Sequence, residues 1–380
     1  MKSDVTIIGA GILGTSIAYF LSQITSHNVL VLDQAPQAGF HTSSRNTGKV
    51  HAPFLYDPQK KKIFAKSAKI GFEMWESYCK QKNIQFKKDG VLEVALDEQG
   101  INRLEKYMSW GEQNGLQRDE IVLLDGTEVK KLEPEVSCQK AIFCKKDASV
   151  DYGVLTKCIM EDAKNSGATF LVNTQAGNIK KRQDFLEIAT NKGTIQTGLV
   201  INAAGGMAID IAHQMDVRSD LTDIHFRGEY WQAEPQYQNL TKTSVYSVPK
   251  HPEYPFLDPH WIVRSDGRCE VGPNAVPVFS PYGYTISENL KKMPSKISEM
   301  ISSGAAKMLF DPQFISLASG EILSSISKTI MINRVREFLP KVDPKKFKKR
   351  GTSGIRASVI DKNSKFVPDA ITVSGNKSFH

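Results

Sequence analysis

Near the N-terminus the chain reads Asp4-Val-Thr-Ile-Ile-Gly9-Ala-Gly11-Ile-Leu-Gly14, and this stretch decides the fold. It is typical of a buried strand that ends in a glycine turn and continues into a helix. Gly9 permits the tight turn, Gly11 lets the backbone approach a pyrophosphate, and Gly14 lets the helix lie close to the strand. The N-terminus of the helix offers free N–H groups and a partial positive charge to phosphates. The cofactor-binding residues predicted here are Gly9, Gly11, Ile12, Leu13 and Gly14.

A second strand, Val29-Leu-Val-Leu-Asp33, completes a βαβ unit over about residues 3 to 34 and ends in an acid. Asp33 lies 19 residues after Gly14, where an acid can bind a ribose hydroxyl. A carboxylate there repels a 2′-phosphate, so NADP is not expected. We include the adjacent Gln34 in the predicted cofactor site. The alternative, a glycine-rich turn without a ligand, is disfavoured because all the elements occur in order.

Length and composition indicate a globular chain. Its 380 residues can bury one large core or two closely packed ones, and a 24% share of charged residues is ordinary. The formal net charge of +8 fits an anionic cofactor and a small anionic substrate, and also weak attraction to acidic lipid. No compact basic and aromatic module occurs, so nucleic acid is not an expected partner.

Cysteine usage indicates a reduced environment, and hydropathy indicates neither a membrane span nor a signal peptide. The five cysteines are widely spread without a C-x-x-C pair, so we expect neither a disulfide framework nor a metal site. No stretch of 18 apolar residues occurs, and the apolar N-terminal run is the cofactor strand rather than a signal peptide. We expect a cytoplasmic protein, with peripheral contact at the inner face of the membrane as a further option.

Farther along, helical and strand-like patterns alternate. A helix is predicted through Phe64, Phe72 and Cys79, further helices near 101–114 and 152–166, and a hairpin around Asn191-Lys-Gly193. The stretches 225–231, 261–264 and 269–272 are expected to be strands of one antiparallel sheet. The predicted fold class is α/β, with a Rossmann-like cofactor domain and an interleaved domain built on a mixed or antiparallel β-sheet. The expected cofactor domain comprises 1–85, 145–206 and 331–380, and the expected substrate domain comprises 86–144 and 207–330.

Three further segments favour FAD over NAD as the cofactor. The loop from His41 to His51 follows the ribose acid by 8 to 18 residues, and its hydroxyls and arginine can bind the far phosphate and ribitol of an extended FAD. The strand end Ala203-Ala-Gly205 and the late segment Gly354-Ile-Arg356 allow close backbone approach to a ligand. The additional cofactor-binding residues predicted from these segments are Ser43, Ser44, Arg45, Thr47, Gly48, Ala203, Ala204, Gly205, Gly354, Ile355 and Arg356.

Several motifs resemble those of the L-2-hydroxyglutarate dehydrogenase family, within the D-amino-acid oxidase-like superfamily of FAD-dependent enzymes. The motifs in this chain are Asn46-Thr-Gly-Lys-Val-His-Ala-Pro-Phe-Leu-Tyr56, Phe226-Arg-Gly-Glu-Tyr230, Tyr254-Pro-Phe-Leu257, Val271-Gly-Pro-Asn-Ala-Val276 and Gly354-Ile-Arg-Ala357. The chain departs from the family at Lys49 and Pro53, where the family has an apolar residue and a glycine. The family also continues beyond the position of His380, with a stretch expected to pass the flavin.

The resemblance implies a flavoprotein oxidoreductase that oxidises L-2-hydroxyglutarate to 2-oxoglutarate. A hydride would pass to flavin N5, and electrons would go on to a quinone, another carrier or oxygen. Two alternatives stay open. The same fold could act on glycerol-3-phosphate or on a secondary amine or amino acid, or the chain could be a non-catalytic flavin-binding subunit.

Five residues are the catalytic candidates. The resemblance places His51 beside the flavin, and a neutral imidazole suits a base, although it could instead bind the cofactor or cap a turn. Arg356 could grip a carboxylate bidentately or form an internal salt bridge. Arg227 and Tyr230, three apart on a predicted strand, should face opposite sides, so we expect only one of them in the pocket. Asn274 could orient the substrate or belong to a turn.

A basic run occurs at Lys345-Lys-Phe-Lys-Lys-Arg350. It is compatible with contact to an anionic membrane surface, which would serve electron transfer to a quinone. The alternative is a solvated loop.

Overall fold

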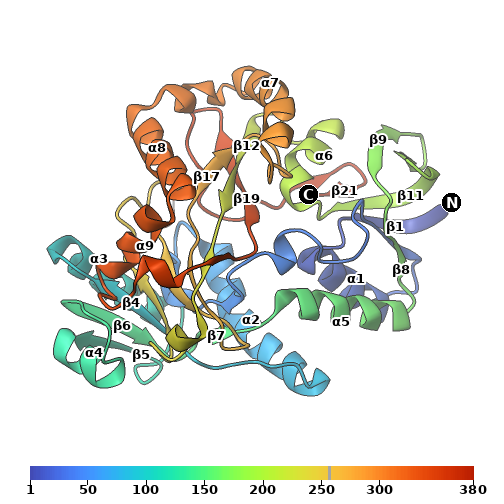
Figure 1. Cartoon of the computed structure of the whole chain (residues 1–380). Coiled ribbons are helices and arrows are strands. Elements are labelled where there is room, and N and C mark those ends of the chain that lie inside the picture. Colours follow the sequence, from blue (N-terminus) through green and yellow to red (C-terminus); the bar gives the residue numbers. More distant parts are fainter. Residues whose placement is uncertain (256–257) are drawn as a thin grey trace.

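A mixed sheet carries the predicted βαβ unit, and the computed structural model, which describes residues 1–255 and 258–380, confirms the α/β fold class. Its central strands β1, β2, β8 and β11 are parallel, and helices α1 and α5 pack together beside them (Figure 1). All four residues of β2 are buried, as expected for a parallel strand covered on both faces. The elements are β1 (Lys2–Ile8), α1 (Ile12–Ile24), β2 (Val29–Leu32), α5 (Tyr152–Asn165), β8 (Thr169–Leu171), β9 (Ala176–Lys181), β10 (Leu186–Thr190), β11 (Gly193–Asn202), α6 (Ala208–Gln214), β20 (Ser374–Gly375) and β21 (Ser378–Phe379).

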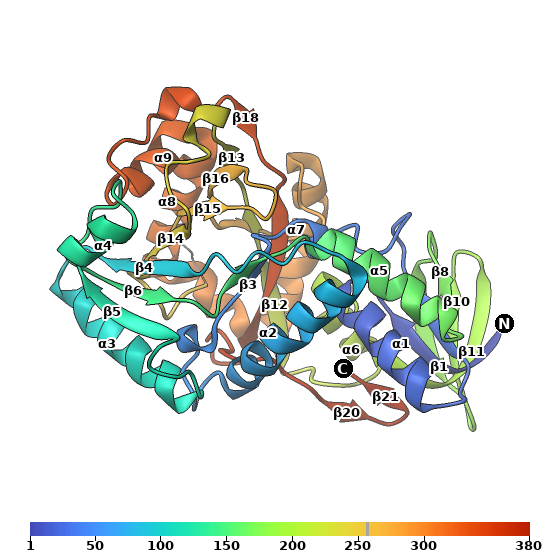
Figure 2. The same cartoon turned by 90° about the horizontal axis from the view of Figure 1, so that it is seen from below.

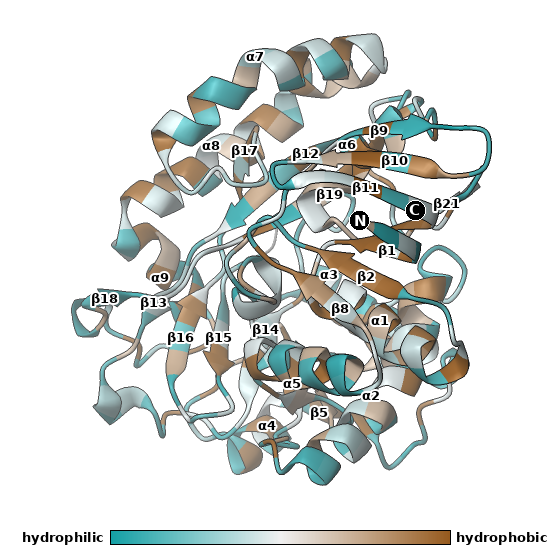
Figure 3. Ribbon diagram, turned by 90° about the vertical axis from the view of Figure 1, so that its right-hand side faces the viewer, coloured by the Kyte–Doolittle hydropathy of each residue, from teal (hydrophilic) through white to brown (hydrophobic). Residues whose placement is uncertain are grey.

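The last strands of the chain return to this first sheet. Strand β21 pairs in parallel with β11, and β20 lies outside it (Figure 2). Figure 3 shows hydrophobic colouring along β1 and β2, the inner strands of the sheet. The hairpin expected around Asn191 is confirmed, because β10 and β11 pair antiparallel and close at Thr190 and Gly193.

A second sheet forms the other lobe. Its strand order is β18-β13-β16-β15-β14-β4-β6-β5. Buried side chains of the sheet and of α9 form its main core, with Trp261, Phe338 and Phe347 among the largest fully buried side chains. The elements are β4 (Val91–Ala95), α3 (Glu98–Gln113), β5 (Ile121–Asp125), α4 (Gly126–Leu132), β6 (Lys140–Cys144), β13 (Trp231–Gln232), β14 (Ser244–Ser247), β15 (His260–Val263), β16 (Cys269–Gly272), α9 (Lys328–Arg336) and β18 (Lys349–Arg350).

A small third sheet lies between the two lobes (Figure 1). It consists of β17 (Val276–Val278), β12 (Leu221–Gly228) and β19 (Gly354–Asp361), with α7 (Ile286–Ser302) and α8 (Pro312–Ile326) packed nearby. The expectation of one antiparallel sheet was therefore wrong for β12, which pairs with β17 and β19 rather than with β15 and β16. Local alternation predicts a strand, but it carries no information about which strand is its partner.

A short crossing joins the lobes. Strand β3 (Lys49–Val50) pairs with β7 (Ala148–Ser149), and α2 (Lys62–Lys82) confirms the helix expected through Phe64, Phe72 and Cys79. The expected domain boundaries remain a prediction. Within 331–347, a stretch that we placed in the cofactor domain, Met331, Val335 and Phe347 belong to the core of the second sheet.

Three further features bear on function. No helix of the described residues is long and apolar enough to cross a membrane. All five cysteines are free thiols. Among residues 1–255 and 258–380, no group of three or more His, Cys, Asp or Glu side chains could hold a metal ion. Residues 256–257 of the Tyr254-Pro-Phe-Leu257 motif lie outside the described structure.

Candidate functional site

The turn between β1 and α1 requires glycine at two positions. Gly9 has a φ of +110°, and a Cβ there would lie 2.2 Å from the carbonyl oxygen of Ala203. A Cβ on Gly14 would lie 1.9 Å from the carbonyl oxygen of Gly9. The turn, the first turn of α1 and the end of β11 are therefore in direct backbone contact.

The N-terminus of α1 is free of acidic side chains. Gly11 is its N-cap and offers no side chain to cap the helix, and the first turn contains no acid. The N–H of Ile12 donates to Ser43 Oγ at 2.9 Å, which ties the helix to the loop that follows β2. A helix N-terminus without an acidic side chain in its first turn favours an anion.

Asp33 fixes the same turn from the end of β2. Its carboxylate accepts the N–H of Ala10 at 2.7 Å and the N–H of Ala35 at 2.8 Å. Each carboxylate oxygen keeps a further lone pair, so a ribose hydroxyl could still donate to it. Gln34 next to it donates through Nε2 to the hydroxyl of Tyr282, which belongs to the segment after β17.

A cleft runs along this turn, with about 940 Å³ of empty space when open solvent is included. Gly205 borders it with a φ of +57°, and no atom lies within 4 Å of the position of a Cβ there. The structure thus brings together predicted residues from five segments of the chain. Those that line the cleft are Gly9, Gly11, Asp33, Gln34, Ser43, Ala203, Ala204, Gly205 and Ile355.

A second hollow, with about 1110 Å³ of empty space, adjoins the first at Ser43. Ser44, Arg45 and Gly48 line it. The remaining predicted cofactor residues, Ile12, Leu13, Gly14, Thr47, Gly354 and Arg356, line neither hollow. Gly354 has a packing role, since a Cβ there would lie 1.8 Å from the carbonyl oxygen of Arg45.

Arg45 contacts protein groups as well as the hollow. Its Nε donates to the carbonyl oxygen of Phe40 at 3.2 Å, and its guanidinium lies 4.8 Å from the ring centre of Tyr284. The guanidinium is therefore held by its neighbours in this structure.

His51 lies at the crossing between the lobes. Its Nδ1 is 3.1 Å from Asp147 Oδ2, and its ring packs against Tyr246 with 5.7 Å between ring centres. Tyr246 in turn packs against His260 at 4.1 Å. The Tyr246 hydroxyl and His260 Nδ1 are buried without a hydrogen-bond partner among the described residues. Unpaired buried polar atoms beside His51 indicate a place where a ligand or water supplies the missing partner.

Arg356 lies on β19 and reaches toward the loop before β15, where it donates to the carbonyl oxygen of Pro255. The side chain is solvent-exposed, yet burial lowers the pKa of its guanidinium. Tyr230 is close enough to oppose this shift, and burial raises the pKa of the Tyr230 phenol to about 12.

Lys61, the residue that precedes α2, is a further candidate site residue that was not predicted from the sequence. Burial and the charge of Arg356 both lower the pKa of the Lys61 ammonium, which places the two cations within electrostatic reach of each other. Asp369 holds this end of α2 by accepting the N–H groups of Ile63 and Phe64. The signal lay in the run Lys60-Lys-Lys62, which begins four residues after the tyrosine of the His51 motif, but a charge run alone does not separate one lysine from the others.

Arg227 and Asn274 both bind Glu229 in this structure. Arg227 forms an ion pair with Glu229 at 3.1 Å and donates to the carbonyl oxygen of Gly283. Asn274 is buried, accepts the N–H of Glu229 and donates to its carboxylate. Tyr230 follows the end of β12 at Gly228, so the expected alternation of Arg227 and Tyr230 along one strand does not apply.

Comparison with known proteins decides the family. The model of the family described as FAD dependent oxidoreductase matches residues 4–368. This chain belongs to that family. L-2-hydroxyglutarate dehydrogenase of Indibacter alkaliphilus is 28% identical over 389 residues, spanning 100% of this chain and 93% of that protein. The mitochondrial L-2-hydroxyglutarate dehydrogenase of Homo sapiens is 28% identical over 385 residues, spanning 98% of this chain and 81% of that protein.

The fold comparison agrees with the family. The structure of L-alpha-glycerophosphate oxidase from Mycoplasma pneumoniae, solved with FAD bound, matches with a TM-score of 0.77 at 21% identity and covers 100% of this chain and 88% of that one. The enzyme is accordingly an FAD-dependent oxidoreductase of a small substrate. The glycine turn, the acid-free helix N-terminus and the open side of Gly205 fit an extended dinucleotide in the first cleft.

Proposed function

We propose that this FAD-dependent oxidoreductase oxidises L-2-hydroxyglutarate to 2-oxoglutarate. Two cations within electrostatic reach of each other, Arg356 and Lys61, support the proposal, because a substrate with two carboxylates calls for two cations; Asp57 and Asp369 lie within the same reach of Lys61. The names of the relatives that align along nearly the whole chain support the same substrate.

The residues that would hold the cofactor follow from the first cleft. Gly9, Gly11 and the N-terminus of α1 would bind the pyrophosphate, and Asp33 would bind the adenosine ribose. When bound, FAD supplies the acceptor, at flavin N5, for the hydride that leaves the carbinol carbon of the substrate. Electrons then leave the enzyme to a quinone, another carrier or oxygen.

The protein supplies orientation and a base. Arg356 binds one carboxylate of the substrate through its planar fork, and Lys61 neutralises the other as a point charge. His51 takes the hydroxyl proton at Nε2 as the hydride departs, so that the alcohol becomes a ketone without a charged intermediate on the substrate. Holding the reacting C–H toward the cofactor is the main task of the two cations.

Peripheral contact with an anionic membrane is a second part of the proposal. Helix α8 exposes Ile315, Ile322, Leu323 and Ile326 on one side, and Ile326 is 76% exposed. The basic run lies beside this stripe, because Arg350 donates to the carbonyl oxygen of Ser325. An apolar stripe flanked by cations suits the interface of an anionic bilayer. Such contact would bring the enzyme to a membrane-bound electron acceptor.

A substrate panel tests the assignment. The FAD-loaded protein is assayed with an artificial electron acceptor against L-2-hydroxyglutarate, glycerol-3-phosphate, glycine and sarcosine. We expect turnover with L-2-hydroxyglutarate and at least 100-fold lower kcat/KM with the others, a difference of about 2.7 kcal/mol. Preferred turnover of glycerol-3-phosphate or of an amine would replace the assignment. A flavin-loaded protein that turns over none of them would favour the non-catalytic subunit.

A further inference from the structure

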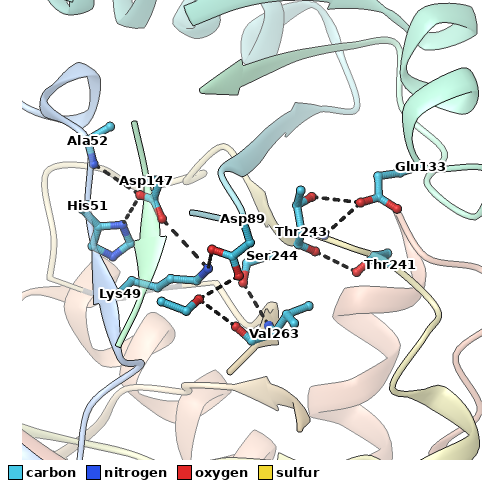
Figure 4. A network of polar contacts seen from close by, with 11 residues as sticks. Lys49, His51, Ala52, Asp89, Glu133, Asp147, Thr241, Thr243, Ser244 and Val263 are labelled. Carbon is cyan, nitrogen blue, oxygen red and sulfur yellow. Dashed lines mark hydrogen bonds and ion pairs between the residues drawn. The ribbon is translucent and has the colours of Figure 1, made fainter. Parts of the chain in front are cut away.

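A buried ion network lies directly behind His51 (Figure 4). Lys49 has a fully buried side chain whose Nζ is 3.2 Å from Asp89 Oδ1 and 4.0 Å from Asp147 Oδ1. Asp89 also accepts the hydroxyl of Ser149 at 2.8 Å. Asp147, fully buried itself, accepts the N–H of Ala52 at 3.2 Å through the same oxygen that faces His51 Nδ1.

Chain topology explains why these groups meet. Lys49 is on β3, and β3 pairs with β7, which follows Asp147 directly. Asp89 comes from the loop that bonds back to β7, since the N–H of Lys87 donates to the carbonyl oxygen of Ser149. Lys49 is also one of the two positions where the His51 loop departs from the family motif that it resembles.

Burial disfavours the charged forms of the other titratable groups around His51. Burial raises the pKa of Glu93 on β4 well above its usual value, and burial lowers the pKa of His260 on β15 to about 3. Burial likewise raises the pKa of Tyr246 on β14, and it raises the pKa of Tyr56 to about 12. Burial also raises the pKa of Tyr152 at the start of α5. Lys49, Asp89 and Asp147 are the charged side chains of the network beside His51, with Lys87 farther off beside Asp89.

We propose that Asp147 is the positioning carboxylate of His51, and that the Lys49–Asp89 pair sets the negative charge that Asp147 presents to it. The proposal rests on the proposed function, which makes His51 the base. His51 donates a hydrogen bond from its Nδ1–H to Asp147. The lone pair on Nε2 is then free to accept the proton of the substrate hydroxyl. Because Asp147 also binds the backbone N–H of Ala52, the carboxylate is fixed relative to the backbone of the histidine it orients.

The charges of the network assist proton uptake. Burial raises the pKa of Asp89, and Lys49 and Ser149 oppose this shift. With both carboxylates ionised, the cluster of one lysine and two carboxylates has a net charge of −1, and a proton arriving on His51 brings the total to zero. Lys49 lies closer to Asp89 than to Asp147, so most of the Asp147 charge stays available to the imidazole. Because Lys49, Asp89 and Asp147 are buried, the charge they present acts more strongly on a neighbour than a charge at the surface would.

Two variants of the network separate this role from a structural one. In Asp89→Asn, Lys49 loses its nearer partner and turns its charge to Asp147, so the cluster becomes neutral. We expect His51 to titrate at least about one pH unit lower, with the acid limb of the pH–rate profile moving equally. In the double variant Lys49→Met/Asp89→Asn the cluster again carries −1, and we expect both values to return close to those of the unaltered protein.

The direct readout is ¹⁵N NMR of histidine-labelled protein, which reports the tautomer and the titration of each ring without needing turnover. The chain has eight histidines, and a His51→Gln spectrum identifies the His51 signals. Asp147→Asn should lower the titration midpoint in the same direction as Asp89→Asn. Glu133→Gln, which alters another buried carboxylate that binds Thr243, should leave His51 unchanged.

Three results would overturn the proposal. They are an unaltered protein whose His51 carries its proton on Nε2, a titration that Asp89→Asn leaves in place, or a double variant that shifts as far as the single one. These outcomes are distinct from failure of the proposed function. An enzyme that prefers another substrate can still show the NMR shifts, and a true L-2-hydroxyglutarate oxidoreductase can still lack them.

Discussion

His51 Nδ1 lies 3.1 Å from Asp147 Oδ2, although the two residues are 96 positions apart in the chain. The pairing of β3 with β7 brings them together at the crossing between the lobes. If His51 is the base, His51→Gln keeps the volume and removes the proton acceptor. We expect kcat to fall by about 100-fold or more with little change in KM, measured by stopped-flow reduction of the flavin. A variant with unaltered kcat would remove His51 from the reaction.

Lys61 and Arg356 should affect the choice of substrate in different ways. Lys61→Met removes the charge that serves the distal carboxylate, so kcat/KM for L-2-hydroxyglutarate should fall by about tenfold or more. The same variant should leave kcat/KM for 2-hydroxybutyrate, which lacks that carboxylate, nearly unchanged. Arg356→Lys should lower kcat/KM for both substrates by a similar factor, because a lysine cannot replace the bidentate fork of an arginine. Equal losses for both substrates in Lys61→Met would contradict the assignment of Lys61.

Glycine at the βα turn should be indispensable for cofactor retention. A Cβ at Gly14 would sit 1.9 Å from the Gly9 carbonyl oxygen, so Gly14→Ala should displace the turn and destabilise the fold by about 1–3 kcal/mol. The ratio of flavin to protein absorbance should fall with it. Gly320 on α8 is the matched control, because no atom lies within 4 Å of its Cβ position. Gly320→Ala should stabilise the protein by about 0.5–1 kcal/mol and retain FAD. Normal flavin content in Gly14→Ala would contradict the close packing.

Stability should depend on pH through His260. Its pKa falls from 6.5 to about 3 because burial disfavours the imidazolium. The unfolded chain therefore binds a proton between these values that the folded chain does not, and stability is lost as pH falls through this window. Between pH 6.5 and about pH 4 this loss amounts to about 3 kcal/mol. Urea unfolding at both values should show a correspondingly smaller loss for His260→Leu. An equal loss in the two proteins would show that other groups carry the dependence.

The exposed stripe on α8 should govern membrane contact. We expect the protein to co-sediment with vesicles that contain anionic lipid and not with neutral vesicles, and to be released by salt. Replacing Ile322 and Ile326 by serine should reduce the bound fraction, because each removes exposed apolar area from the interface. Ile24→Ser, which alters an isoleucine that is 79% exposed on α1, is the control. Binding that persists in the α8 double variant would place the contact elsewhere.

Local patterns in the sequence predicted much of the fold and the cofactor cleft. The glycine spacing and the acid at Asp33 are consecutive along the chain, so their geometry follows from one βαβ unit. The pairing of β12 with β19 depends on residues more than a hundred positions apart, and no local signal carries it. For the same reason the sequence did not predict Asp147, which a strand pairing brings to His51, or Lys61, whose pKa the distant Arg356 lowers.

Oxidation of L-2-hydroxyglutarate is tested by anaerobic mixing of this substrate with the FAD-loaded protein while the visible absorbance of the oxidised flavin is recorded. We expect rapid loss of that absorbance with the L enantiomer and formation of one 2-oxoglutarate per flavin. A flavin that stays oxidised with L-2-hydroxyglutarate, in protein shown to hold its cofactor, would rule out this substrate.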